Sequence, residues 1–395
     1  MELYILDSTF KETMLIESYE TAIWTERFRS PGDVEITTLS TPENKSLLRV
    51  GTYLGTDLSP RIMEIDTVKD SISDDGIKML KITGTSLERI LDFRTTRQYF
   101  NILDDDEVWL FNDKKPTAIL REVFKKVCVD GVLSVNDKIP YIQNWPTGIT
   151  PLYNHSDIPE PTQNISIELP VQTISKTFED FLTSYLTLGY RLYRRPGYPS
   201  ELYFDVYTGC DRTLMQKSNT PVVFSLPWGT LDSYSELDSI AEYANVAYVF
   251  SKYGSVKVND SLYTGFDRRV LTLVVNDQLS NNLRAGPLTA YLTQKGLEAL
   301  AEAKRTALVE GKIPQNVGYT YMKDYNLGDY VDLLGTGDSG ARMTIVENIF
   351  VSDKEGFRSY PTFEMDEHID PDTWSGLRGG EVWSTMPGYW ETYSS

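Results

Sequence analysis

The stretch from Leu202 to Leu231 contains two alternating apolar runs, LYFDVY and PVVFSL, on either side of a polar segment. Its turn-rich centre holds Gly209, Asp211 and Arg212. Alternation of apolar and polar residues is typical of half-buried strands, and the polar centre is typical of a connecting loop. The stretch is therefore predicted to be two β-strands joined by a loop, which restricts the chain to folds rich in strands.

Composition supports a strand-rich globular protein. The chain has 395 residues, of which 41% are hydrophobic, and it contains 25 tyrosines. This length predicts roughly two to four domains, and the aromatic and β-branched runs favour strands. The two cysteines, Cys128 and Cys210, are too few for a secreted disulfide scaffold, so we expect reduced thiols in a protein made in a cytosol. Neither a signal peptide nor an apolar run of about 18 residues is visible, so no membrane anchor is expected.

The strong negative charge argues against nucleic-acid binding. The formal net charge is −19, and such binding needs a basic face. The longest basic cluster, Tyr190–Arg195, alternates like a strand and is interpreted as a solvated strand edge rather than an anion site. The acidity favours solubility.

The first two regions differ in character. Residues 1–100 are predicted to form a β module, with a hairpin made by Arg61–Lys69 and Gly76–Thr83. A short helix is expected next, because Thr85–Glu88 has the form of a capping box. Residues 101–230 change to a middle α/β region with two amphipathic helices and a long irregular loop.

Residues 231–366 are predicted to form a second β module with helices. One helix is expected from Ser235 to about Asn245, and the longest helix from Thr289 to Val309. Residues 367–395 are interpreted as an extended arm containing three tryptophans, Trp374, Trp383 and Trp390. Because such side chains are costly to leave in water, the arm is expected to dock either on its own chain or on a partner.

No motif for catalysis, a metal or a cofactor is evident. The two histidines, His155 and His368, lack zinc-site spacing, and neither a nucleophile elbow nor a phosphate-binding loop is present. The acidic run Asp104–Glu107 lacks the spacing of a calcium loop. We expect no enzyme activity, no cofactor and no metal. Two alternatives stay open: a cell-wall glycosidase using two carboxylates, and a receptor-binding or glycan-binding module using either the aromatic residues of the loop at 139–170 or the tryptophan-containing arm.

Several segments, taken in order, resemble the tail-tip (baseplate) hub family of siphophages. This tail-protein family is typified by Rhodococcus phage ReqiPepy and is related to the baseplate hub of contractile-tailed phages. The segments that carry the resemblance are Trp24–Phe28, Pro31–Ile36, Ile82–Leu91, Gly189–Leu192, Gly209–Ser225 and Tyr325–Val331.

The resemblance implies an α+β, β-rich multidomain fold with two small β-barrel domains, at 1–100 and 231–366, and an inserted middle region. It implies a homotrimer at the virion tail tip, in which six barrels match a six-fold tube to a three-fold tip. The implied partners are the distal tail protein, the tape measure protein and tip or receptor-binding proteins. DNA would be only passing cargo.

The resemblance also gives the chain its structural and interface candidates. Three glycines would permit tight strand exits, although ordinary turns would also use them. Asp211 and Arg212, which follow Gly209, would fix the loop or a subunit contact through separate partners. The full set is Gly84, Gly209, Asp211, Arg212, Gly328, Asp329, Trp374, Trp383 and Trp390.

Overall fold

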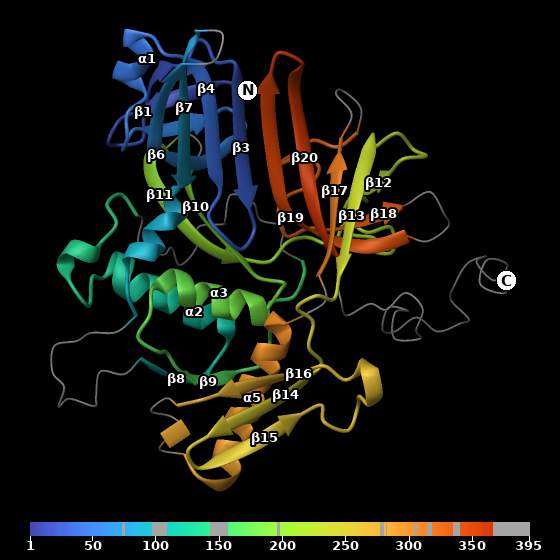
Figure 1. The fold of residues 1–395 in the computed structure, drawn as a ribbon. Coiled ribbons are helices and arrows are strands. Elements are labelled where there is room, and N and C mark those ends of the chain that lie inside the picture. The colour runs from blue at the N-terminus through green and yellow to red at the C-terminus, as the bar shows by residue number, and fades with distance from the viewer. Residues whose placement is uncertain are drawn as a thin grey trace.

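The computed structural model describes residues 1–72, 76–96, 109–142, 157–195, 198–276, 280–281, 283–303, 306–313, 318–334 and 340–365. In Figure 1 the blue N-terminal strands lie beside the orange and red C-terminal strands, a green helical region lies below them, and a small yellow module lies furthest away. The predicted β-rich α+β class is confirmed.

The N-terminal strands form half of a large sheet in the order β2-β1-β5-β6-β7-β4-β3. All neighbouring pairs are antiparallel, and the predicted hairpin is present as β6 and β7. Trp24, Ile36 and Ile82 are fully buried on one face of this half. Its elements are β1 (Leu3–Leu6), β2 (Glu12–Leu15), β3 (Thr21–Arg27), β4 (Asp33–Leu39), α1 (Pro42–Leu47), β5 (Tyr53–Thr56), β6 (Ser59–Ile72), β7 (Lys78–Ser86) and a 3₁₀ helix (Leu87–Phe93).

The C-terminal strands form the other half of the same sheet, in the order β13-β17-β20-β19. β18 pairs with β19, and β12 runs parallel to β18. These strands are β12 (Val223–Ser225), β13 (Ser233–Ser239), β17 (Thr306–Lys312), β18 (Tyr330–Leu334), β19 (Gly340–Asp353) and β20 (Gly356–Met365).

The two halves are joined by antiparallel pairing of β3 with β19. The register runs from Ala22 opposite Ser352 to Arg27 opposite Glu347, and it sets Trp24 opposite Phe350. Both aromatic side chains belong to one buried cluster. Strands from the two ends of the chain therefore share backbone hydrogen bonds and a core.

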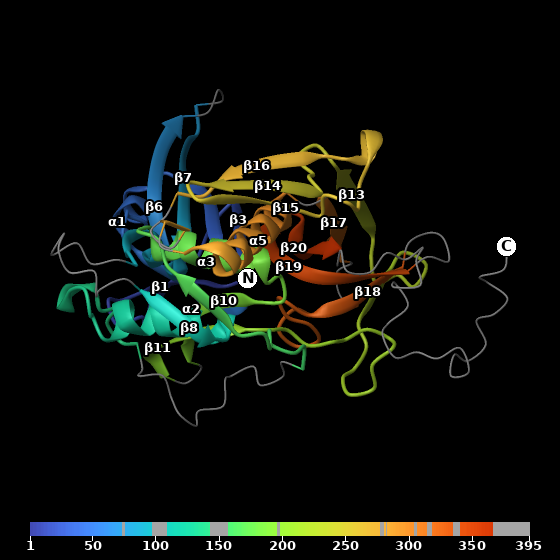
Figure 2. The ribbon, with the colours of Figure 1, turned by 90° about the horizontal axis from the view of Figure 1, so that it is seen from below.

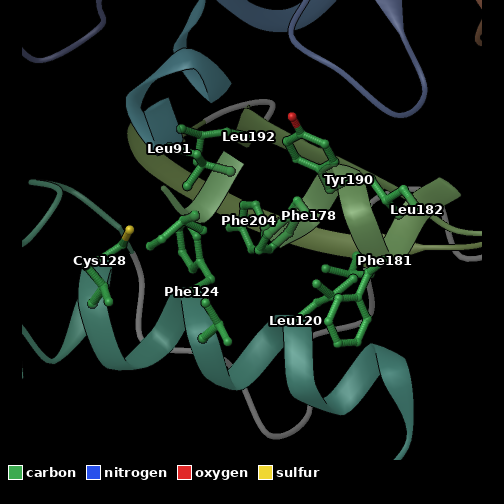
Figure 3. Packing of buried hydrophobic residues seen from close by; sticks show 14 of the residues in the cluster. Leu91, Leu120, Phe124, Cys128, Phe178, Phe181, Leu182, Tyr190, Leu192 and Phe204 are labelled. Carbon is green, nitrogen blue, oxygen red and sulfur yellow. The ribbon is translucent and has the colours of Figure 1, made fainter. Parts of the chain in front are cut away.

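The middle region packs two helices against a hairpin. Phe124 stacks on Phe204 with ring centroids 3.6 Å apart, and Phe178 meets Phe204 edge-on (Figure 3). The elements are β8 (Leu110–Lys114), α2 (Pro116–Phe124), a π-helical turn (Lys125–Val129), a 3₁₀ turn (Val135–Asp137), β9 (Ile165–Glu168), α3 (Ile174–Ser184), β10 (Gly189–Arg195) and β11 (Tyr198–Tyr207). Cys128 and Cys210 are both buried free thiols.

A separate small module is inserted between β13 and β17. Its three-stranded sheet has the order β15-β14-β16, and one helix covers one face. The elements are β14 (Val246–Ser251), β15 (Gly254–Val258), a 3₁₀ turn (Gly265–Asp267), β16 (Val270–Val274) and α5 (Ala285–Glu302). Within the described residues, no helix is both long and apolar enough to cross a bilayer.

Two helix expectations in this region are wrong. The segment expected to be helical from Ser235 is the strand β13, which pairs along its whole length with β17. The long helix ends at Glu302 rather than Val309, because Thr306 already begins β17. Both errors have one cause: the two segments satisfy each other's backbone groups, and a local pattern cannot reveal a partner so distant in sequence.

The expectation that Tyr190–Arg195 forms a solvated edge is also wrong. β10 lies between β11 and β6, and all but its last residue are buried. Arg191 is buried because it pairs with Asp205 at 3.3 Å and stacks on Tyr207 at 4.2 Å. Buried guanidinium groups need such partners, which strand periodicity does not disclose.

Candidate functional site

Two loops distant in sequence meet at their backbones. A Cβ placed on Gly209 would lie 2.0 Å from the carbonyl oxygen of Gly328, so only glycine allows this approach. Gly328 has a φ of +88°, and a Cβ there would lie 2.5 Å from the ring of Phe28. Two of the three glycines singled out from the sequence therefore touch each other.

The carboxylate of Asp329 ties the two loops together. Oδ1 accepts a hydrogen bond from the backbone N–H of Cys210 at 2.8 Å. Oδ2 accepts from Arg212 Nε at 2.7 Å and from the backbone N–H of Asn326 at 2.9 Å. We call Gly209, Arg212, Gly328 and Asp329 the clamp. The sequence named all four residues but did not indicate that they interact.

Burial changes the acidity of the clamp carboxylate. The side chain of Asp329 is only 1% exposed. Desolvation raises its pKa to about 6, against the opposing effect of its hydrogen bonds and of the Arg212 charge. The fold therefore favours the protonated form more strongly than water does.

Asp211 has separate partners from its neighbour Arg212. Its Oδ1 accepts hydrogen bonds from the N–H and the hydroxyl of Thr213, at 2.9 and 2.6 Å. Its own N–H donates to Asp157 at 2.6 Å, and Asn219 donates to its carbonyl oxygen at 2.8 Å. These contacts, all within the chain, hold the loop after β11 in one conformation.

The remaining candidates are not part of the clamp. Gly84 lies on β7, where a Cβ would come within 2.3 Å of the Glu64 carbonyl oxygen beside a β-bulge. Trp374, Trp383 and Trp390 lie outside the described residues, as do His155 and His368.

A buried charge cluster next to the clamp was not predicted. The guanidinium of Arg61 lies 3.3 Å from a carboxylate oxygen of Glu88 and 3.6 Å from one of Glu26. Tyr321 donates a hydrogen bond to Glu26 at 2.9 Å. Burial lowers the pKa of Arg61, but the two carboxylates outweigh this effect and raise it, so the guanidinium stays charged.

The sequence contained a signal for this cluster. Glu26 alternates with Trp24 on β3 and with Phe28 just after it, which sets its carboxylate on the inward face of an apolar strand. Glu88, expected to close a capping box, instead accepts a hydrogen bond from the N–H of Leu192 at 2.8 Å and makes no cap. An acidic residue at an inward strand position predicts a buried partner.

A cleft of about 790 Å³ lies between β9, α3 and α5. Among its lining residues, the one carboxylate is that of Glu298, which pairs with Lys295 at 2.7 Å. A glycosidase site needs two carboxylates across one cleft, and this lining has one. The described residues also contain no group of acidic, histidine or cysteine side chains suited to a metal.

Two solved structures share this fold. The 43 kDa tail protein of prophage MuSo2 from Shewanella oneidensis is 12% identical, with a TM-score of 0.54 over 92% of this chain and 97% of that one. The tail protein from Neisseria meningitidis MC58 is 11% identical, with a TM-score of 0.53 over 95% and 98%. The fold is therefore of the class found in phage tail proteins.

The family follows from the sequence itself. Residues 2–359 match the family of Siphovirus ReqiPepy6 Gp37-like proteins, and the chain belongs to that family. The resemblance inferred from the order of segments is thus confirmed. No curated protein matches the sequence.

The close approach at the clamp predicts a large effect of one added methyl group. Gly209→Ala forces the two backbones apart, and we expect it to lower the free energy of unfolding by about 2–4 kcal/mol, the range of overpacking and strain. Chemical denaturation followed by circular dichroism measures this change.

Gly286→Ala is the matched control, because a Cβ at Gly286 meets nothing within 4 Å. It lies in α5, where alanine is the better helix former, so its stability should be unchanged or slightly raised. Equal stability of the two variants would contradict the backbone contact.

The raised pKa of Asp329 predicts a pH dependence. The folded pKa of about 6 exceeds the ordinary 3.8, so protonated Asp329 stabilises the fold below pH 4 and that contribution is lost as the pH rises through 6. Relative to Asp329→Asn, the wild type should lose up to about 3 kcal/mol between pH 4 and 7.

Denaturation of both proteins across this pH range measures the effect. The loss of the hydrogen bonds that Asp329→Asn removes lowers the free energy of unfolding by the same amount at every pH. Only the difference between the two proteins in how this free energy changes with pH therefore reports the titration of Asp329. A wild type that gains stability relative to the variant with rising pH would contradict the prediction.

Proposed function

We propose that this protein is the trimeric hub at the distal end of a siphophage tail, where it joins the six-fold tail tube to the three-fold tip and receptor-binding apparatus. Membership of the Gp37-like family and a fold shared with phage tail proteins support a structural tail role. The observation that carries the proposal is the pairing of β3 with β19.

A protein that joins a six-fold tube to a three-fold tip needs two similar modules held in a fixed arrangement, and the pairing of β3 with β19 holds them so. Each chain carries two β modules, and a ladder of six residue pairs makes them one sheet, so they cannot rotate independently. Three chains arranged head to tail would present six such modules towards the tube and keep three-fold symmetry below. In this proposal residues 1–100 and 231–366 are the two barrel domains, and residues 101–230 face outward or towards the tip.

The proposed partners follow from that position. The distal tail protein and the tape measure protein would contact the ring from the tube side, and tip or receptor-binding proteins from the other. The acidic chain, at −19, would line a channel that repels passing DNA. In this role the protein is not an enzyme, and its place is the virion tail tip.

In the proposed ring, the clamp would fix the conformation of the exposed loop that contains Leu214 and Met215. Leu214 and Met215 follow Thr213 directly and are 50% and 52% exposed. The hydrogen bonds of Arg212 and Asp211 hold this loop in place, so its two apolar side chains are presented outward at little entropic cost. We assign them to the contact with a neighbouring subunit.

The mass of the purified protein tests the assembly. We expect mass photometry to give three times the 45.0 kDa chain mass, and negative-stain images to display a three-fold ring with a central hole. If the chain alone is a monomer, the same measurement is made after adding the distal tail protein. A monomer in both samples, or a ring of another order, would contradict the proposal.

Substitutions in the loop test the contact. The double variant Leu214→Ser/Met215→Ser should weaken trimer formation roughly tenfold or more while the melting temperature of the subunit stays the same, since both side chains are exposed. Arg212→Ala should weaken trimer formation and also lower the melting temperature of the subunit, because it leaves buried Asp329 without its cation. Val135→Ser, at a residue 69% exposed in the middle region, is the control and should change neither.

A further inference from the structure

The inserted module presents an apolar sheet face. On one side of its sheet, Ala247 and Val249 pack against Leu292 of α5. On the other side, Phe250 pairs with Val274, and their side chains are 43% and 71% exposed. Figure 2 shows β14 and β16 at the periphery, with α5 between them and α3. The apolar face therefore points away from the rest of the described chain.

Cations lie around this face in an otherwise acidic protein, together with the carboxylate of Asp260, which pairs with Arg268 and lies 3.9 Å from Lys257. Lys257 lies on β15 with its ammonium 5.0 Å from the ring centre of Tyr248, and it is exposed. Arg284 lies 3.6 Å over the ring of Tyr253 at the turn between β14 and β15. Arg268 donates a hydrogen bond to the Tyr248 hydroxyl at 2.7 Å. We call Tyr248, Phe250, Lys257, Val270 and Val274 the outer face; Val270 is 43% exposed.

The C-terminal arm, extended by one residue to include Asp366 because β20 ends at Met365, has the complementary composition. Residues 366–395 contain six carboxylate side chains, a single arginine and the three tryptophans Trp374, Trp383 and Trp390. Tryptophan side chains gain most from burial against apolar and cationic surfaces, and the carboxylates would meet the lysine and arginine groups.

The arm also starts next to the module. Glu364 of β20 pairs with Leu308 of β17, so β20 ends, at Met365, alongside the beginning of β17. β17 begins at Thr306, only three residues after Ala303, the C-cap of α5. An extended chain covers about 3.3 Å per residue, so thirty residues span far more than the width of a three-stranded sheet.

We propose that the arm, residues 366–395, folds back over the outer face of its own chain, with its tryptophans against Phe250, Val270 and Val274 and its carboxylates near Lys257 and Arg284. The inference rests on the exposed face, its charge and the strand register, and it does not use the hub assignment. Failure of either proposal leaves the other intact.

Hydrogen–deuterium exchange on the full chain tests the docking. In the variant Trp374→Ser/Trp383→Ser/Trp390→Ser, amides of residues 246–251 and 270–274 should exchange about tenfold faster than in the wild type. Amides of β3 and β19 should be unchanged. Phe250→Ser/Val274→Ser should speed exchange in the arm itself, whereas Val135→Ser, the control, should not. Unchanged exchange in both the module and the arm would overturn the proposal.

A cross-linking experiment identifies which chain supplies the arm. Equal amounts of ¹⁴N-labelled and ¹⁵N-labelled protein are mixed and treated with a zero-length reagent that joins amines to carboxylates. We expect links from Lys257 to the arm in which both peptides carry the same label. Mixed-label links would instead show exchange of arms between copies and overturn the same-chain assignment, and links to lysines elsewhere would overturn the assigned surface.

Discussion

The hydrogen bonding between β3 and β19 is the interaction on which the rest of the architecture depends. It unites strands from the two ends of the chain, and it brings Trp24 and Phe350 into one core. Backbone pairing of this kind is directional, so it fixes the orientation of the two β modules as well as their contact. The middle region and the small module are both insertions between strands that this pairing holds in place.

A group of buried charged side chains lies next to the pairing of β3 with β19, because one of these side chains is on β3 itself. Glu26 lies on β3 facing inward, and its charge is offset by Arg61 of β6 and the hydroxyl of Tyr321. The clamp lies beside it, since Gly328 contacts Phe28 immediately after β3. Buried ionic groups add little net stability, but each one strongly penalises arrangements that leave it unpaired. These charges therefore specify one way of bringing the loops together.

Local pattern was sufficient for elements whose partners are near in sequence. Alternation predicted the hairpin of β6 and β7, and the amphipathic stripe predicted α3. It failed at β13, whose partner β17 follows only after a whole inserted module. The clamp residues were singled out, but Arg212 and Asp329 are 117 residues apart, and no periodicity encodes such a contact. Burial of Arg191 was missed for a different reason: its partners Asp205 and Tyr207 lie on the neighbouring strand β11, but strand alternation does not show that their side chains enclose its guanidinium.

The way the small module is attached has an evolutionary consequence. The chain enters and leaves it at one point, where the N–H of Ala244 donates to the carbonyl oxygen of Ala303 at 2.7 Å. An insertion whose two ends meet imposes no strain on the strands that carry it, whatever its length. A different domain whose two ends lie equally close could therefore replace this unit without disturbing the strands that carry it.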